Sequence, residues 1–124
     1  MNNKIKLRIL PLFFLMSLPV MAEEYRTFGQ MSAEEMQTVN EAKFNYGECM
    51  NEFAMSQLEQ QTDPRVIADH SMKSCASILE ELHNFFVSNN FDPNFSKSFI
   101  RRVSNREANK LLSNLMMFMA TKNQ

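Results

Sequence analysis

Glycine and tryptophan are scarce in this chain of 124 residues, which has two glycines and no tryptophan. With Gly29 and Gly47 alone, the sequence cannot form a glycine-rich phosphate loop, a dinucleotide-binding fingerprint or a nucleophile elbow. Alternating runs of β-branched residues, which indicate strands, are missing as well. A chain with so few turn-forming residues is most simply an all-α domain of three to four helices joined by few connections.

Sequence signs of catalysis and of a resident cofactor are also missing. There is no HExxH motif, and the two histidines, His70 and His83, lie about 220° apart around the helix on which we expect them. Several glutamates of the helix expected from residue 33 share one wet flank: Glu41, Glu48, Glu52 and Glu59. This spacing gives no support for a paired-carboxylate hydrolase. We therefore expect no enzyme activity, no catalytic residue, no metal ligand and no cofactor.

Residues 1–22 are typical of a signal peptide. Basic residues without any acid precede an apolar run over 9–18, and the residues that follow suit cleavage after Ala22. The run of about ten residues is shorter than the roughly 20 that span a bilayer; a short uncleaved anchor is the alternative. We expect a mature chain outside the cytoplasm, periplasmic or secreted, with no transmembrane segment. Residues 23–124 would then form a single helical domain.

Helix-start signals divide this expected domain. After a flexible leader over 23–31, residues 32–35 form a capping box, from which a helix of about 28 residues could run to Gln61. Asp-Pro at 63–64 is a cap-plus-proline start for the next helix, which should fade at 88–90. That helix carries apolar residues at alternating spacings of four and three, the seam of an antiparallel pair: Ala68, Met72, Cys75, Leu79, Leu82 and Phe86.

The C-terminal segment has two start signals. Asp92 and Pro93 begin a helical stretch that extends to about Ala120, and Ser104 to Glu107 is a second capping box. The sequence leaves open whether this box bends one long helix or opens a separate one. In either case we expect the segment to pack across the antiparallel helical hairpin.

The two cysteines of the chain lie at equal distances from the expected break. Cys49 precedes Thr62 by 13 residues and Cys75 follows it by 13. If the flanking helices are antiparallel, each sulfur lies roughly 20 Å from the turn, so the two thiols are level. Two cysteines in an exported chain of this size favour a structural disulfide. The alternatives are two metal-binding thiols or a redox pair, but redox pairs usually lie close in sequence at a helix start.

Charge is unevenly divided along the expected mature chain. Residues 23–92 hold 13 acidic and four basic residues, whereas residues 93–124 hold one acidic and six basic residues. Arg102, Arg106 and Lys110 recur every four residues, so on a continuous helix they form a basic ridge. The ridge could engage an anionic partner such as an acidic protein, membrane headgroups or a cell-wall polymer. Alternatively, the basic segment packs near the hairpin glutamates and compensates their charge.

These considerations give a candidate partner-binding surface on the C-terminal segment. Its members are Lys97, Arg101, Arg102, Arg106, Lys110, Phe95, Phe99 and Met117. We expect an exported, non-catalytic binding protein whose partner is another exported protein or an anionic surface. Nucleic acid does not suit an expected mature chain that is net negative.

Abundant methionine and phenylalanine support two other functions. The chain has 11 of each, and methionine lines adaptable binding surfaces. A small chaperone could expose a Met/Phe-rich surface when acid protonates the hairpin glutamates. The chain could instead carry an apolar ligand within the bundle, or a metal, because thioethers near a histidine bind Cu(I). Dye binding at acid pH would support the chaperone, and elemental analysis or mass spectrometry of the native protein would test the carrier.

Overall fold

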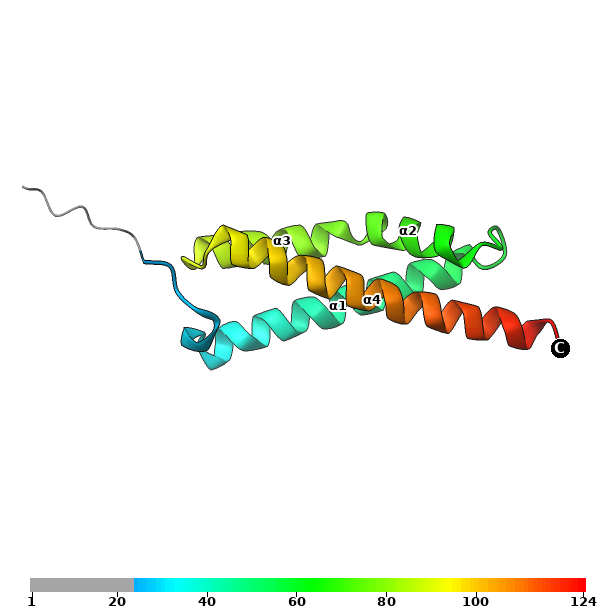
Figure 1. Cartoon of the computed structure of the whole chain (residues 1–124), viewed down its shortest axis with the longest axis horizontal. Coiled ribbons are helices and arrows are strands. Elements are labelled where there is room, and N and C mark those ends of the chain that lie inside the picture. The colour runs from blue at the N-terminus through cyan, green and yellow to red at the C-terminus, as the bar shows by residue number, and fades with distance from the viewer. Residues whose placement is uncertain (1–23) are drawn as a thin grey trace, which may run out of the picture.

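The computed structural model describes residues 24–124, and the predicted signal peptide lies outside this range. Within it, four α-helices follow a turn of 3-10 helix, η1 (Phe28–Gln30): α1 (Ala33–Gln57), α2 (Pro64–Ser74), α3 (Ala76–Ser88) and α4 (Pro93–Lys122). Helices α2 and α3 run roughly in line beside α1, and α4 packs across all three (Figure 1). The described residues contain no strand beyond an isolated bridge. The all-α prediction is confirmed.

The first helix begins at the predicted capping box. The Ser32 hydroxyl accepts a hydrogen bond from the Glu35 amide at 3.1 Å, and the Glu35 carboxylate accepts one from the Ser32 amide at 3.2 Å. The helix ends at Gln57, four residues before the predicted Gln61. The difference arises at the turn, where the Gln61 side chain accepts hydrogen bonds from the amides of the next two residues.

The second predicted helix is interrupted. Asp63 caps α2 by accepting a hydrogen bond from the Arg65 amide at 2.9 Å, as expected, but the helix stops at Ser74 and α3 starts at Ala76. The residue between them, Cys75, has a φ of −101° and a ψ of 3°. One turn earlier, the buried Ser71 hydroxyl donates to the carbonyl of Ile67 at 2.8 Å, and hydroxyl bonds of this kind favour helix bends. The predicted seam nevertheless lies on the buried or half-buried side of both helices.

The turn between α3 and α4 has a helix-terminating geometry that suits its sequence. Asn90 has a φ of 63°, the left-handed conformation that asparagine tolerates better than most residues. The amide of Phe91 donates to the carbonyl of Phe86 at 3.0 Å, and the amide of Asn90 donates to that of Val87 at 3.2 Å. These two bonds satisfy carbonyls at the end of α3 and direct Phe91 into the core, where it is 1% exposed.

The last segment is one helix from Pro93 to Lys122, so the second capping box does not open a separate helix. Ser104, the expected cap of that box, lies within α4, and its hydroxyl is 3.3 Å from the hydroxyl of Tyr46 on α1. Tyr46 is buried, and its burial raises the pKa of its phenol. Contact with α1 therefore gives the Ser104 hydroxyl a partner outside its own helix.

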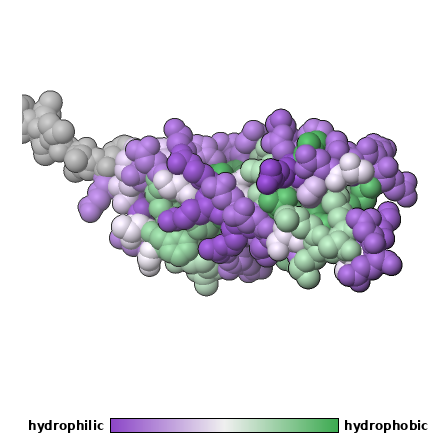
Figure 2. All heavy atoms as spheres, turned by 45° about the vertical axis from the view of Figure 1, so that its right-hand side comes forward, coloured by the Kyte–Doolittle hydropathy of each residue, from purple (hydrophilic) through white to green (hydrophobic). Residues whose placement is uncertain are grey.

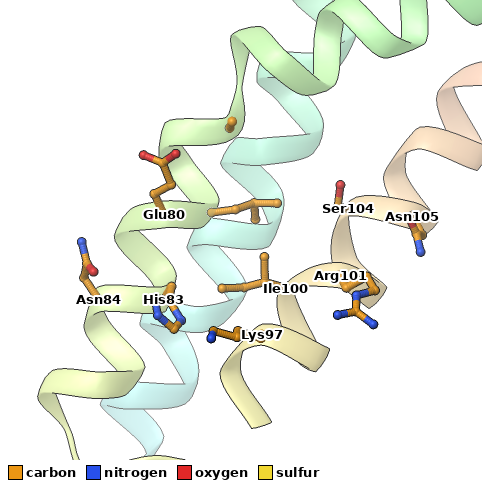
Figure 3. Close-up of a pocket in the computed structure, with 10 residues that line it drawn as sticks. Glu80, His83, Asn84, Lys97, Ile100, Arg101, Ser104 and Asn105 are labelled. Atoms are coloured by element: carbon orange, nitrogen blue, oxygen red, sulfur yellow. The ribbon is translucent and has the colours of Figure 1, made fainter. Parts of the chain in front are cut away.

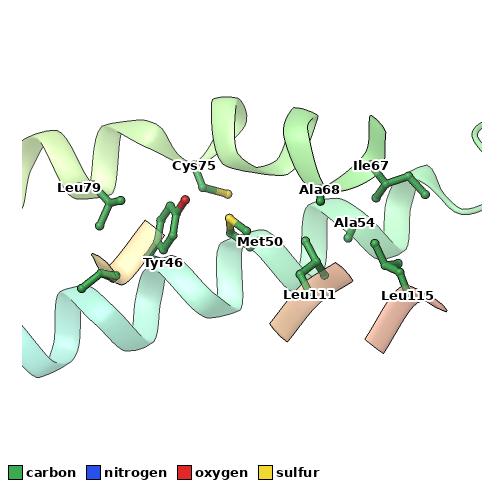
Figure 4. Close-up of a cluster of buried hydrophobic side chains, with 10 residues drawn as sticks. Tyr46, Met50, Ala54, Ile67, Ala68, Cys75, Leu79, Leu111 and Leu115 are labelled. Carbon is green, nitrogen blue, oxygen red and sulfur yellow. The ribbon is translucent and has the colours of Figure 1, made fainter. Parts of the chain in front are cut away.

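The predicted disulfide is present. Cys49 of α1 and Cys75 are bonded, with their Cα atoms 6.0 Å apart. Around the bridge, one hydrophobic cluster joins α1, α2 and α4 through residues such as Met50, Ile67 and Leu111 (Figure 4). A second cluster, rich in phenylalanine, fills the end of the bundle near the α3–α4 turn. The two helical arms of the hairpin are therefore joined by a covalent bridge within the first of these clusters.

The segment that precedes α1 contacts the rest of the domain at the aromatic end. The amide of Arg26 donates to the carbonyl of Asn90 at 2.9 Å, and its guanidinium lies 4.6 Å from the centre of the Phe91 ring. The same guanidinium donates to both carboxylate oxygens of Glu35, at 2.7 and 2.8 Å. These hydrogen bonds lower the pKa of Glu35 to about 2. Residues 24–31, expected to be a flexible leader, thus form defined contacts.

Candidate functional site

The basic ridge of α4 is on the surface, as the sequence predicts. Asp92 caps the helix by accepting a hydrogen bond from the Asn94 amide at 2.8 Å, and Pro93 occupies the first turn. Because α4 is continuous, the four-residue spacing of Arg102, Arg106 and Lys110 places them on adjacent turns, and all three are exposed.

Ion pairing hardly involves the α4 cations. Within residues 24–124 there are three ion pairs, Arg26–Glu35, Lys73–Asp69 and Lys110–Glu107. None of them joins a basic residue of α4 to an acid of the hairpin. The remaining cations of the candidate surface, which form no ion pair within the described part of the chain, are Lys97, Arg101, Arg102 and Arg106. Direct pairing with hairpin glutamates therefore does not occupy these cations.

The acidic residues of α1 lie on the solvent side of their helix. Of the glutamates expected to form its wet flank, Glu41, Glu48 and Glu52 lie on α1 and are exposed, whereas Glu59, also exposed, lies in the turn after the helix ends at Gln57. The core side of α1 carries Val39, Tyr46 and Met50, each 1% exposed. The domain thus presents an acidic stripe on one helix and a basic ridge on another, with no ion pair between the two among the described residues.

The single acid of α4 lies where α4 approaches α1. Glu107 is mostly buried, with its side chain 19% exposed, and it pairs with Lys110 at 3.4 Å. A Cβ atom added to Gly47 on α1 would lie 3.0 Å from one of the Glu107 carboxylate oxygens. Gly47 therefore leaves room for this carboxylate, which also neutralises the C-terminal end of the ridge.

Two phenylalanines of the candidate surface, Phe95 and Phe99, pack against the aromatic core cluster. The ring centres of Phe95 and Phe99 lie 5.6 and 5.4 Å from that of Phe86, a residue with no exposed surface. The Phe28 ring covers them from the N-terminal segment, with centres 6.0 and 6.1 Å away. Both phenylalanines are half-buried, so we place them in the aromatic cluster rather than on a contact surface.

Several other large apolar side chains are exposed. Met117, a member of the candidate surface, is 67% exposed, and its neighbour Met116 is 57% exposed. The remaining members of this set on α1 and α4 are Phe44, Met55 and Phe118. Figure 2 shows green hydrophobic areas on one face of the molecule, separated by purple hydrophilic side chains. A small domain thus presents methionine and phenylalanine to solvent beside its charges.

A groove of about 650 Å³ lies between α3 and α4 and was not expected from the sequence. Its walls carry Lys97 and Arg101 from α4 and His83 from α3 (Figure 3). The Nδ1 atom of His83 is 2.8 Å from the Ser96 hydroxyl, which is buried. A signal was available, because His83 and Lys97 are equally distant from Asn90 in sequence. Residues equally distant from a turn lie level in an antiparallel pair, as the cysteines do.

The structure places the sequence-predicted basic residues on two sides of α4. Lys97 and Arg101 border the groove, whereas Arg102, Arg106 and Lys110 form the ridge.

Within residues 24–124, no three histidine, cysteine, aspartate or glutamate side chains are grouped so that they could hold a metal ion. None of the helices in this range combines the length and the apolar character needed to cross a membrane.

Comparison with known proteins identifies no relative. No protein-family model, curated protein or solved structure matches this chain.

Proposed function

We propose that this chain is an exported, non-catalytic binding protein that engages an acidic partner protein through the basic ridge of α4. The observation that carries the proposal is that Arg102 and Arg106 are exposed and form no ion pair with any residue of 24–124. An exposed stripe of one charge sign steers partners of the opposite sign. The exposed glutamates of α1 do not neutralise the ridge, because within residues 24–124 no ion pair joins α1 to α4.

The side chains around the ridge favour a protein partner over a lipid surface. Met117 lies close to two helical turns beyond Lys110, and Met55 and Phe118 line a groove between α1 and α4. Methionine, aromatic residues and arginine are enriched at protein–protein interfaces. A surface that mixes these three types fits a partner with both acidic and apolar side chains.

Export is the second part of the proposal. It is supported by the signal-like sequence of residues 1–22, which precedes the described residues, and by the Cys49–Cys75 bridge. Structural disulfides form and persist in oxidising compartments. We therefore place the mature chain, beginning at residue 23, in the periplasm or the extracellular space.

Capture of a partner tests the proposed surface. The chain without its signal peptide would be immobilised and exposed to the exported proteins of the cells that make it, at low and at high salt. The variant Arg102→Glu/Arg106→Glu reverses the ridge, and Lys110 stays because it pairs with Glu107. Arg65→Glu/Lys73→Glu is the control, since it changes the net charge equally at exposed positions of α2. It breaks the Lys73–Asp69 pair, but both of those side chains are exposed, so the loss costs little stability, unlike loss of the partner of the mostly buried Glu107.

The proposal expects one partner that is captured at low salt, released at high salt, lost with the ridge variant and kept with the control. Equal capture by the wild type and the ridge variant would exclude the ridge as the site. Binding to vesicles that contain an anionic phospholipid, without capture of any protein, would assign the ridge to a membrane surface instead.

The exposed apolar residues support chaperone-like binding as a second candidate. Phe44, Met55 and Met117 are each more than 60% exposed, so apolar surface is accessible without acid-induced opening. A chaperone should suppress aggregation of an unfolded client protein, and acid should increase its binding of a hydrophobic dye. Unchanged dye binding and no effect on aggregation would exclude this function.

A further inference from the structure

The α3–α4 groove has an apolar floor along its length. Leu79 from α3 and Ile100 from α4 line it, and so does Ala76, which is the first residue of α3 and therefore lies at the end near the α2–α3 interruption. Leu79 is 6% exposed, so the floor is continuous with the hydrophobic core. Ligand pockets typically have volumes of about 300 to 1,000 Å³ and a mostly apolar lining. The groove, at about 650 Å³, lies within this range.

The opposite end of the groove is polar and is held by a buried contact. Ser96, with no exposed surface, holds the Nδ1 atom of His83 at 2.8 Å. The ring is thereby fixed. When Nδ1 accepts the hydrogen bond from the Ser96 hydroxyl, Nε2 carries the proton and can donate it to a ligand oxygen. Lys97 follows Ser96 in α4, and its side chain extends toward His83 (Figure 3). Two nitrogen-bearing side chains from different helices therefore converge at this end.

The charges of the groove favour a monoanion. Lys97 and Arg101 carry positive charges, Glu80 carries the negative one, and none of the three forms an ion pair within residues 24–124. The ionised side chains of the lining thus sum to one positive charge. The polar groups Asn84, Ser104 and Asn105 complete the rim.

We propose that this groove binds a single-chain anionic amphiphile, with its carboxylate between the Lys97 ammonium and the His83 ring and its apolar chain over Leu79 and Ile100. The distance along α3 from His83 to Ala76 is about 10 Å, at about 1.5 Å per residue. A chain of about eight carbons covers that length. The site uses neither Arg102 nor Arg106, so it is independent of the partner-binding ridge.

Three small probes separate the contributions of head and chain. Octanoate has the proposed head and chain, octylamine has the same chain with the opposite charge, and acetate has the head alone. Each would be titrated below its aggregation concentration into the isotope-labelled chain lacking the signal peptide, and methyl resonances would be followed by NMR. We expect saturable binding of octanoate, with the largest shifts at Leu79 and Ile100, and no saturable binding of the other two. Octyl phosphate, which carries more negative charge, should bind more weakly than octanoate.

Charge reversal locates the head. Lys97→Glu should weaken octanoate binding more than tenfold, whereas Arg65→Glu, an equal change in charge at an exposed position of α2, should leave it within twofold. Ser96→Ala should also weaken it, because the His83 ring loses its buried partner, and an unchanged amide spectrum elsewhere would show that the fold is intact. The proposal fails if octanoate does not saturate, if octylamine binds equally well, if octyl phosphate binds more tightly, or if Lys97→Glu has no effect. These outcomes leave the ridge proposal standing, and loss of ridge binding leaves the groove standing.

Discussion

Removal of the disulfide should cost this domain a large part of its stability. The bridge closes a 26-residue separation between Cys49 and Cys75. In the chain-entropy model, a loop of that length stabilises the native state by roughly 3.5 kcal/mol, because it restricts the unfolded chain. Domains of this size have net stabilities of about 5 to 15 kcal/mol. The variant Cys49→Ala/Cys75→Ala should therefore remain helical but unfold far more readily.

Urea denaturation followed by circular dichroism measures this loss. With a slope of about 1.5 kcal/mol per molar urea, 3.5 kcal/mol corresponds to a midpoint about 2 M lower. Wild-type protein under reducing conditions is the matched comparison, since it loses the bond and keeps both sulfur atoms. The two should agree to within about 1 kcal/mol, and any difference would report the packing of Cys75, which is 1% exposed.

Kinetics distinguish the proposed origin of the effect. If the hairpin is already formed in the transition state, removing the bond should mainly slow refolding, because the unfolded chain is then less restricted. The unfolding rate should change less. A midpoint that moves by less than about 0.5 M, in both the variant and the reduced protein, would refute the reasoning.

Three further changes test individual contacts. Arg26→Ala should destabilise the domain at neutral pH and should weaken the dependence of its stability on acid pH. The pKa of Glu35 is lowered to about 2, so the Arg26–Glu35 contact stabilises the fold above the ordinary carboxyl pKa and this stabilisation is lost as the pH falls toward 2. Urea denaturation at several pH values measures the difference. Gly47→Ala should raise helix stability by about 1 kcal/mol, but the full gain should appear only when Glu107→Ala is made as well, because the new Cβ would lie 3.0 Å from the Glu107 carboxylate. If the two changes in the free energy of unfolding are additive in a double-mutant cycle, this reasoning is wrong. Tyr46→Phe should lower the free energy of unfolding by about 1 kcal/mol at neutral pH, because a hydrogen bond is lost. Burial raises the pKa of the Tyr46 phenol in the folded state, so above the ordinary tyrosine pKa the phenol ionises on unfolding and the fold loses stability; the variant should lack this loss. An unchanged profile of unfolding against alkaline pH would count against this reasoning.

Local signals in the sequence predict most of the helical architecture. Ser32, Asp63 and Asp92 each cap the helix that follows them, and a cap depends on residues within one turn. The cysteine pairing also follows, because the two residues are equally distant from a break that is itself a local signal. These features need no knowledge of which helix packs against which.

Features that depend on contacts between distant segments do not follow from local signals. The Ser104 box, which the sequence left open as a helix start or a bend, starts no helix, and its hydroxyl has a partner in Tyr46, 58 residues earlier. The Phe28 ring that covers Phe95 comes from the N-terminal segment, which no local pattern places there. The interruption at Cys75 likewise depends on tertiary context, which overrides the helical propensity of the residues around it.

The candidate site likewise combines features that follow from local sequence signals with features that depend on contacts between distant segments. The exposure of the α4 ridge follows from a four-residue period, which any helix converts into a stripe. Its lack of ion pairs with the hairpin glutamates could not be predicted, because it depends on how α1 and α4 are turned about their axes. The groove beside α3 has only an indirect signal, because it depends on His83 lying level with Lys97 across the α3–α4 turn.

The most direct test of the ridge is its affinity for a glutamate-rich peptide, measured by fluorescence anisotropy over a series of salt concentrations. The wild type and Arg65→Glu/Lys73→Glu should bind this peptide with an affinity that falls steeply with added salt, and Arg102→Glu/Arg106→Glu should show no such binding. If the two variants lose affinity equally, net charge rather than the α4 ridge controls binding, and the proposed function is wrong.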